Sequence, residues 1–462
     1  MTPLNRRSFL SGSIAASFAG KRVFALTTGS IAHLGISHRV LHPAARVPLS
    51  FIIDDSTCLV NMGHFCTPQF SAAFPDRADY KRPWHKWPRE IPDAFVRRFG
   101  EWCAEHGVKG KYSIVPNPAC VGWLDRELPG WSRQQLKDSL SLVRDLMVPN
   151  WDIHPEMITH TRVIDLKTGR PLPNPGPSTM ENWYPREKKS VDELAAYLAY
   201  ALRILKNCDL PCTGVTTPGG FGNMVKPELS QAAGEALRDV YGLEIPHYFK
   251  YVHTGEESTD PILESVTGRG TDQISLTMNV PAGTGDWFGG WQGANPSQGH
   301  LYSNEDATGG RMVELIKKGQ PAVMLCHWPG LYSNGSHEGF EHFCKVVTSL
   351  HRRFGKVTRW MKISEMARYE SARQLTDVAI EDHVVTLKAP FAAPLFTIEL
   401  SDPRLSGLTI SPTIHRVGVQ KPMKKVSQRH QLASGTWFQD ESTIILCFDL
   451  PKGASQIKLT RL

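Results

Sequence analysis

The sequence predicts an α/β protein: a distorted (β/α) barrel over residues 46–372 and a small all-β sandwich over residues 373–462. Three observations carry this prediction. Up to about residue 361, short apolar runs alternate with helical patterns, which is typical of parallel βα units. After residue 373, short strands follow one another without helices between them. The 462 residues are also too many for one ordinary domain.

Each expected element rests on a local pattern. Val96, Phe99, Trp102 and Cys103 recur at helical spacing before Gly107, and Ser132 is a typical N-cap residue. Residues 61–90 have aromatic residues without a period and predict a loop, and residues 162–190 predict a Pro/Gly-rich insertion. The expected barrel strands are 46–53, 110–115, 150–156, 212–217, 274–280, 322–326 and 357–361, and the helices are 91–106, 132–147, 191–207, 227–241, 309–318 and 340–354. The expected sandwich strands are 378–380, 384–387, 396–400, 444–448 and 457–459.

The N-terminus resembles a twin-arginine export signal over residues 1–25, followed by a linker over residues 26–45. Arg6 and Arg7 stand two residues before Phe9-Leu10, and a modest apolar stretch follows. No other apolar run is long enough to span a bilayer. We therefore expect a protein without a membrane span once mature, which is periplasmic or secreted and whose partner during export is the twin-arginine machinery.

Charge and cysteine content narrow the function classes. The net charge of +7 comes from dispersed Lys and Arg, so nucleic-acid binding is not expected. The nine cysteines are spread over the whole chain and do not form a disulfide scaffold. Cys208 and Cys212 are close enough in sequence to pair, but two buried thiols are the equal alternative.

The first chemical signal is the pair Asp54-Asp55, which follows the apolar run 48–53. In α/β barrels the C-terminal ends of the strands form the catalytic face. Two adjacent carboxylates repel each other, so one is usually bound to a metal or has a raised pKa. His327 follows the apolar strand 322–326 in the same way, and imidazole is well suited to act as a general acid near neutral pH.

A second signal lies between residues 151 and 161. Glu156 and His160 are four residues apart, so on one helical turn they would share a face and could bind one metal ion. His154, two residues before Glu156, is the alternative ligand. Such a carboxylate and imidazole set suits a divalent metal, with zinc the favoured ion.

In their order, these motifs resemble the polysaccharide deacetylases, the NodB-homology group within the glycoside hydrolase/deacetylase superfamily. The resemblance covers about residues 46–370 and includes Pro218-Gly219 after a strand. It implies a barrel that is often seven-stranded, and a metal-dependent hydrolase that removes an acyl group from an N- or O-acylated sugar. Together with the N-terminal signal, it leads us to expect an exported enzyme. It also implies that Asp54 is the general base, Asp55 and His160 are metal ligands, and His327 is the general acid.

The sequence departs from that family in two motifs. Glu156 stands where the family has its first metal-binding histidine, and Thr216 stands where it has an arginine that orients the catalytic aspartate. The fourth motif is matched at best by Asp286-Trp287. The expected substrate-binding residues are Gly219 and Gly220, whose N–H groups could hold an oxyanion, and Asp286, Trp287 and Trp328, with Trp84, Trp87 and Trp291 as further aromatic candidates.

Two other functions remain open at this point. A glycosidase of the same superfamily would need two carboxylates on either side of the glycosidic bond, and Asp54 with Glu156 or Asp286 could supply them. A catalytically inactive carbohydrate-binding protein is the other alternative, because the arginine is absent and a histidine is replaced.

Overall fold

The computed structural model describes residues 36–55, 59–381, 383–402, 410–416 and 419–461. The predicted export signal, with Arg6 and Arg7, lies outside the described residues, as does the first part of the predicted linker. The eight cysteines within the described ranges are all free, including Cys208 and Cys212. Within these ranges, no helix is both long and apolar enough to cross a membrane.

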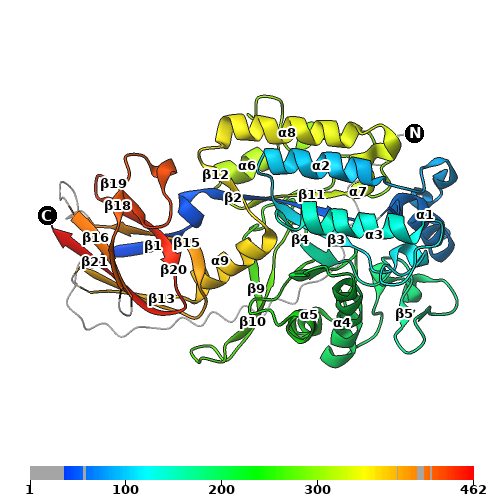
Figure 1. Ribbon diagram of the computed structural model, residues 1–462, viewed down its shortest axis with the longest axis horizontal. Helices are drawn as coiled ribbons and strands as arrows, with labels where there is room; N and C mark the ends of the chain where they lie inside the picture. Colours follow the sequence, from blue (N-terminus) through cyan, green and yellow to red (C-terminus); the bar gives the residue numbers. More distant parts are fainter. Residues whose placement is uncertain (1–35, 56–58, 382, 403–409, 417–418, 462) are drawn as a thin grey trace, which may run out of the picture. The chain divides into compact units, whose positions relative to one another are not determined.

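The first parallel sheet has the strand order β11-β2-β3-β4, and β12 pairs with β2 (Figure 1). The strand register places His327 of β11 directly opposite Asp54 of β2. The C-terminal ends of these strands therefore meet at one edge of the sheet. The strands are β2 (Val47–Asp54), β3 (Gly110–Ile114), β4 (Trp151–Pro155), β11 (Ala322–His327) and β12 (Thr358–Trp360).

The second sheet has the order β7-β8-β10-β9, in which β7, β8 and β10 are parallel and β9 is antiparallel to β10. Isolated parallel bridges connect the two sheets at Ile153 with Cys212 and at Asp286 with Leu325. The mixed α/β class is confirmed, but the parallel strands are divided between two sheets, so a closed seven-stranded barrel stays a prediction. The strands are β7 (Gly214–Thr216), β8 (His247–Phe249), β9 (Ile262–Thr267) and β10 (Ser275–Asn279).

Helices cover these sheets, and α2 and α8 lie against each other (Figure 1). Phe99 of α2 and Phe340 of α8 have ring centroids 5.8 Å apart, and Phe343 of α8 stacks on Phe51 of β2. These rings bury one face of each amphipathic helix on the first sheet. The helices are α2 (Asp93–Glu105), α3 (Arg133–Leu142), α4 (Val191–Asn207), α5 (Lys226–Tyr241), α6 (Arg311–Lys317), α7 (Trp328–Tyr332), α8 (Glu338–Phe354) and α9 (Ile363–Leu375).

The expectation of a loop over residues 61–90 is wrong in part, because α1 (Met62–Ala73) forms there. Asn61 caps it by accepting a hydrogen bond from the Gly63 N–H. Met62, Cys66 and Phe70 are all buried and four residues apart, which places them on one face. The sequence did not predict this helix, because the helical spacing of apolar residues does not continue through the rest of residues 61–90.

The C-terminal strands form two antiparallel-rich five-stranded sheets, β1-β15-β20-β19-β18 and β13-β14-β21-β16-β17. Leu387 and Ile457 from one sheet and Phe396 and Leu446 from the other belong to one hydrophobic core, as in a sandwich. One strand comes from the predicted linker, since β1 (Ser37–Leu41) pairs with β15. The others are β13 (Asp377–Glu381), β14 (Val384–Ala389), β15 (Ala393–Ser401), β16 (Ile410–Arg416), β17 (Val419–Pro422), β18 (Lys424–Lys425), β19 (Thr436–Asp440), β20 (Thr443–Leu450) and β21 (Gly453–Arg461).

Candidate active site

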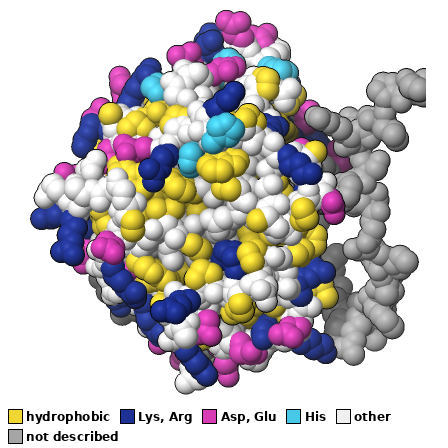
Figure 2. Space-filling model, turned by 90° about the vertical axis from the view of Figure 1, so that its right-hand side faces the viewer, with side chains coloured by type: hydrophobic (Ala, Val, Ile, Leu, Met, Phe, Trp, Pro, Cys, Tyr) yellow, Lys and Arg dark blue, Asp and Glu magenta, His cyan; other side chains and the backbone are white. Residues whose placement is uncertain are grey.

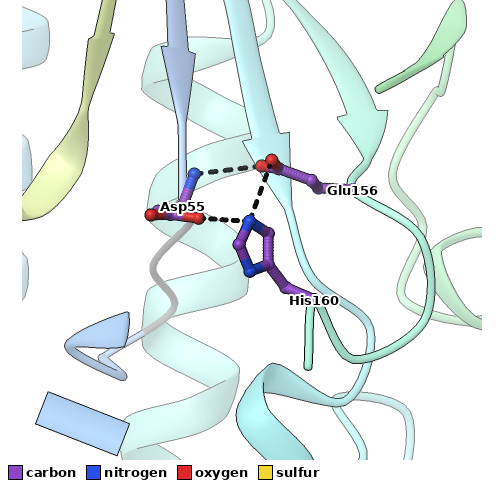
Figure 3. A group of neighbouring side chains, drawn as sticks. All are labelled: Asp55, Glu156 and His160. Atoms are coloured by element: carbon purple, nitrogen blue, oxygen red, sulfur yellow. Dashed lines mark hydrogen bonds and ion pairs between the residues drawn. The ribbon is translucent and has the colours of Figure 1, made fainter. Parts of the chain in front are cut away.

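Asp55, Glu156 and His160 converge at the C-terminal edge of the first sheet (Figure 3). Asp55 follows β2 directly, and Glu156 follows β4. His160 Nε2 lies 2.7 Å from Asp55 Oδ1 and 3.3 Å from Glu156 Oε1, and the Asp55 N–H donates to Glu156 Oε2 at 3.0 Å. One potential ligand atom from each residue lies within 4.8 Å of the other two.

This donor set fits a divalent metal ion. The Asp55 side chain is only 1% exposed, and among the residues that the structure describes Oδ1 contacts His160 Nε2, whereas Oδ2 accepts no hydrogen bond. A buried carboxylate oxygen without a partner is costly, and a bound cation would supply the partner that Oδ2 lacks. Burial alone would lower the pKa of His160, but the Asp55 and Glu156 carboxylates raise it well above its usual value. The same negative field would attract a cation, and two carboxylates with one imidazole are ligands that zinc accepts.

The loop that carries His160 is not the helical turn that the spacing predicts. Met157 and His160 have positive φ angles of 53° and 63°, so the chain turns in a left-handed conformation on the way to the cluster. The buried Glu181 carboxylate fixes this loop by accepting the N–H groups of Ile158, Thr159 and His160 at 3.1, 3.0 and 2.6 Å. Glu156 and His160 therefore lie together as the sequence predicts, but through a left-handed loop and not through a helical turn.

Sequence analysis missed Glu181, which belongs to the 3-10 helix Glu181–Trp183 within the predicted insertion. Tyr197 of α4 also donates to it at 2.5 Å. Burial raises the pKa of Glu181 to about 7, although these hydrogen bonds oppose the shift. Nothing in the local sequence marks this residue, because its partners are 16 to 23 residues away.

Asp54 is held by a buried cation on the neighbouring strand. Lys111 of β3 donates to Asp54 Oδ1, and Ser113 Oγ donates to the same oxygen at 3.1 Å. Lys111 Nζ also donates to Ser113 Oγ at 2.7 Å, and its side chain has no solvent exposure. Burial and the Glu156 carboxylate raise the pKa of Asp54, and this outweighs the lowering by Lys111 and His327.

Lys111 is a functional candidate that sequence analysis also missed. The residue expected at the arginine position, Thr216, is buried and has its hydroxyl 3.3 Å from His154 Nδ1. The cation beside Asp54 therefore comes from β3 and not from β7. A signal was present, because a lysine in a strand that is buried on both faces needs an anionic partner.

His327 ends β11 and pairs with Asp286, whose Oδ2 lies 2.6 Å from His327 Nδ1. Burial alone would lower the pKa of His327, but the carboxylates of Asp55, Asp286 and Asp54 raise it to about 9. His327 is therefore protonated at neutral pH, as a general acid must be. Asp286, expected to bind substrate, instead orients this imidazole.

His154 lies apart from the metal-ligand cluster. Its Nε2 is 3.1 Å from His247 Nε2, and its ring occupies space that Gly214 of β7 leaves open, since a Cβ there would lie 2.4 Å from His154 Nε2. Burial and the neighbouring His247 lower its pKa well below the usual value. The structure therefore places Glu156, and not His154, beside Asp55 and His160.

These side chains open into a cavity of about 280 Å³. Figure 2 views the face on which α1 lies in Figure 1, where hydrophobic side chains form a broad, interrupted area. The candidate catalytic and metal-binding residues line the cavity together with Gly219, Thr217 and Lys250. Four aromatic residues, Phe70, Tyr80, Phe249 and Trp291, also line it. The cavity thus combines aromatic walls with many polar and charged groups, as a site for a polar ligand requires.

Three expected substrate-binding residues lie elsewhere. Trp328 is fully buried, with its ring centroid 5.0 Å from those of Phe99 and Tyr112, because it begins α7 on the core side of the sheet. Trp287 packs edge-on against Tyr302 and is not among the described residues that line the cavity. The Gly220 N–H donates to the Asn182 carbonyl, so it is not free to hold an oxyanion.

No family model and no curated protein matches the chain. Similar solved structures include a candidate glycoside hydrolase/deacetylase from Parabacteroides distasonis, with 11% identity, a TM-score of 0.40, and coverage of 78% of this chain and 82% of that chain. The catalytic domain of GH30 xylanase C from Talaromyces cellulolyticus has 8% identity, a TM-score of 0.27, and coverage of 92% and 99%. The α-fucosidase of Thermotoga maritima has 10% identity, a TM-score of 0.32, and coverage of 90% and 97%. At these scores, the similarities carry no argument about the reaction of this chain.

Proposed function

We propose that this chain is a metal-dependent hydrolase that removes an acyl group from an N- or O-acylated carbohydrate. The observation that carries the proposal is that three kinds of group line one cavity. They are the buried cluster of Asp55, Glu156 and His160, the Asp54 carboxylate that Lys111 holds, and the protonated His327. A ligand set, a base and an acid are the parts that hydrolysis of an amide or ester requires.

Each residue has a role in the proposed reaction. Asp55, Glu156 and His160 would hold the ion, for which zinc is the favoured choice, and when bound it would polarise the acyl carbonyl and activate water. Asp54 takes the proton from the attacking water, and Lys111 with Ser113 fixes the carboxylate that does so. The C–N or C–O bond to the sugar then breaks, and His327 gives its proton to the leaving amine or alcohol.

The carbohydrate substrate is supported by the aromatic wall. Phe70, Tyr80 and Trp291 line the cavity, and Phe70 lies 5.5 Å from Trp291 and 5.3 Å from Tyr80 between ring centroids. Aromatic rings supply large apolar contact areas at low entropic cost, and their faces can stack on sugar rings.

The carboxylate partners favour deacylation over glycoside cleavage. A glycosidase needs two carboxyl groups facing the glycosidic bond. Glu156 already accepts the Asp55 N–H and contacts His160, and Asp286 binds His327. Both candidates for the second carboxyl group are thus engaged in holding other site residues.

Metal analysis combined with acetate release tests the proposed function. We expect wild-type protein to contain one divalent ion and to release acetate, but not reducing sugar, from acetylated glycans. Asp55→Ala and His160→Ala should remain folded and lose the ion, whereas Asp54→Asn should retain it and lose turnover. His85→Ala, a change at an exposed histidine, is the control for His160→Ala. Full metal content in His160→Ala would contradict the ligand assignment.

We also propose that the protein is exported by the twin-arginine machinery to the periplasm or beyond, on the strength of Arg6, Arg7 and the residues that follow them. Changing both arginines to lysine should leave the protein in the cytoplasm, and cell fractionation measures this. Unchanged export of that variant would contradict the proposal.

A further inference from the structure

Lys250 is a buried cation that lines the same cavity as the metal-ligand cluster. It follows β8 directly, so it lies at the C-terminal end of its strand, as Asp54 does on β2. The residue is 9% exposed and lines the cavity. No other lysine or arginine is among the described residues that line it.

Lys250 forms no close ion pair within the described part of the chain, and Glu264 is the carboxylate that acts on its charge from a greater distance. Its Nζ donates to the Phe221 carbonyl at 2.5 Å, and no carboxylate lies within ion-pair distance. A buried ammonium group without a carboxylate in direct contact is costly. Burial and the nearby Lys226 lower the pKa of Lys250 to about 8, so it is still mostly protonated at pH 7.

A second, independent polar group lines the cavity without a partner. Asn182 Oδ1 is buried and accepts no hydrogen bond from the described residues. Its backbone is fixed, because the Asn182 carbonyl accepts the Gly220 N–H. An amide oxygen without a partner and an ammonium group bonded to a single backbone carbonyl indicate a place for a polar ligand group.

We propose that Lys250 forms a subsite for the carboxylate of an acidic sugar, so that the acylated substrate is a uronic-acid-containing glycan. This deepens the proposed function and rests on it. A single ammonium group suits a singly charged carboxylate, whereas a phosphate group commonly recruits a guanidinium fork or several cations. The Asn182 amide would hold a neighbouring hydroxyl group, and the aromatic wall would hold the ring face.

Equilibrium binding to unacylated sugars tests the subsite separately from the reaction. The probes are a linear uronic-acid tetrasaccharide and a neutral tetrasaccharide of the same linkage, titrated into the full chain by calorimetry. We expect wild-type protein to bind the acidic probe roughly tenfold more tightly, the effect of one charge-assisted contact. Lys250→Met should abolish that difference, Lys250→Arg should retain most of it, and binding of the neutral probe should be unchanged.

A control variant and the salt dependence of binding complete the test. Lys226→Met removes an exposed lysine near the cavity and should leave the preference intact. If Lys250→Met does not fold, the wild-type protein alone decides, because added salt should weaken binding of the acidic probe only. Equal affinity for both probes, or binding of neither, would overturn the subsite. Acetate release without acid preference would leave the proposed function standing, and acid preference without acetate release would leave the subsite standing.

Discussion

The two parallel sheets contribute very different side chains to the same cavity. The first sheet and the loops directly after its strands supply the acids and the imidazoles, whereas the second sheet and the loops after its strands supply Thr217, Gly219 and Lys250. The first set is tied together by short polar contacts. Lys250 makes one hydrogen bond, to a backbone carbonyl.

This difference indicates that the two sheets have different roles: the first performs the chemistry and the second selects the substrate. A group that moves a proton must be held in one position, and the contacts within the first sheet hold Asp54 and His327. A group that selects a substrate must keep bonding capacity for the ligand, as Lys250 and Asn182 do. Changes in the first sheet should therefore alter turnover or metal content, and changes in the second should alter substrate preference.

Among the substitutions discussed here, we expect Lys111→Met to have the largest effect, a loss of turnover. Lys111→Met removes the group that fixes the Asp54 carboxylate, and we expect kcat to fall by about a hundredfold, with the metal retained. Lys111→Arg should restore part of this loss, because it keeps the charge. Lys109→Met is the matched control on the same segment, since Lys109 pairs with the half-exposed Glu365. Steady-state kinetics with metal analysis measure all three, and an unchanged kcat in Lys111→Met would show that the pair only stabilises the fold.

The next effect concerns metal affinity. Glu181→Gln replaces a carboxylate that accepts three N–H groups by an amide that cannot accept all of them, so the His160 loop should loosen. We expect metal affinity to fall by roughly 10 to 100 times, as for other groups that orient a ligand. Competition with a chelator measures this. Glu187→Gln, at an exposed carboxylate, should change nothing, and equal loss in both variants would refute the anchoring role.

A smaller effect is expected in the pH profile. His327 must carry its proton to act as the acid, so turnover should fall as the pH rises through about 9. Asp286→Asn removes one of the carboxylates that raise this pKa, so the alkaline limb of the kcat profile should move to lower pH. Phe65→Leu, away from this dyad, should leave the limb in place. An alkaline limb that does not move in Asp286→Asn would exclude His327 as its source.

Substitutions in the core of the sandwich should have the smallest effect on metal content and KM. Trp437 of β19 is 3% exposed within the sandwich core, and Trp437→Ala should lower the free energy of unfolding by about 3–5 kcal/mol. Metal content and KM of the folded variant should match the wild type, because none of the described residues that line the cavity belongs to the sandwich. Phe438→Ala, at the half-buried neighbour, should destabilise less in the same denaturant titration. Metal loss from folded Trp437→Ala would refute the separation of the two regions.

Local sequence patterns were sufficient to predict the site residues that stand at the end of a strand. Asp54-Asp55 and His327 could be placed together because parallel strands align their C-terminal ends, and the register of β2 with β11 puts them side by side. Glu156 and His160 were paired by spacing, although a left-handed loop and not a helix brings them together. The sequence could not show that the Trp328 ring is fully buried, because burial of an aromatic ring depends on which face of the fold it meets. Substrate binding by Trp287 stays a prediction.

The sequence by itself determined the alternation of strands and helices, the change to short strands near residue 373, and the acids and imidazole that follow β2 and β11. Those features depend on residues that are close together in the chain. The tertiary structure decided that Lys111 is the partner of Asp54, that Glu181 fixes the His160 loop, and that His154 turns toward β7 over Gly214. Each of these choices depends on strands and loops that are distant in sequence, and burial makes the pairing of their charges energetically necessary.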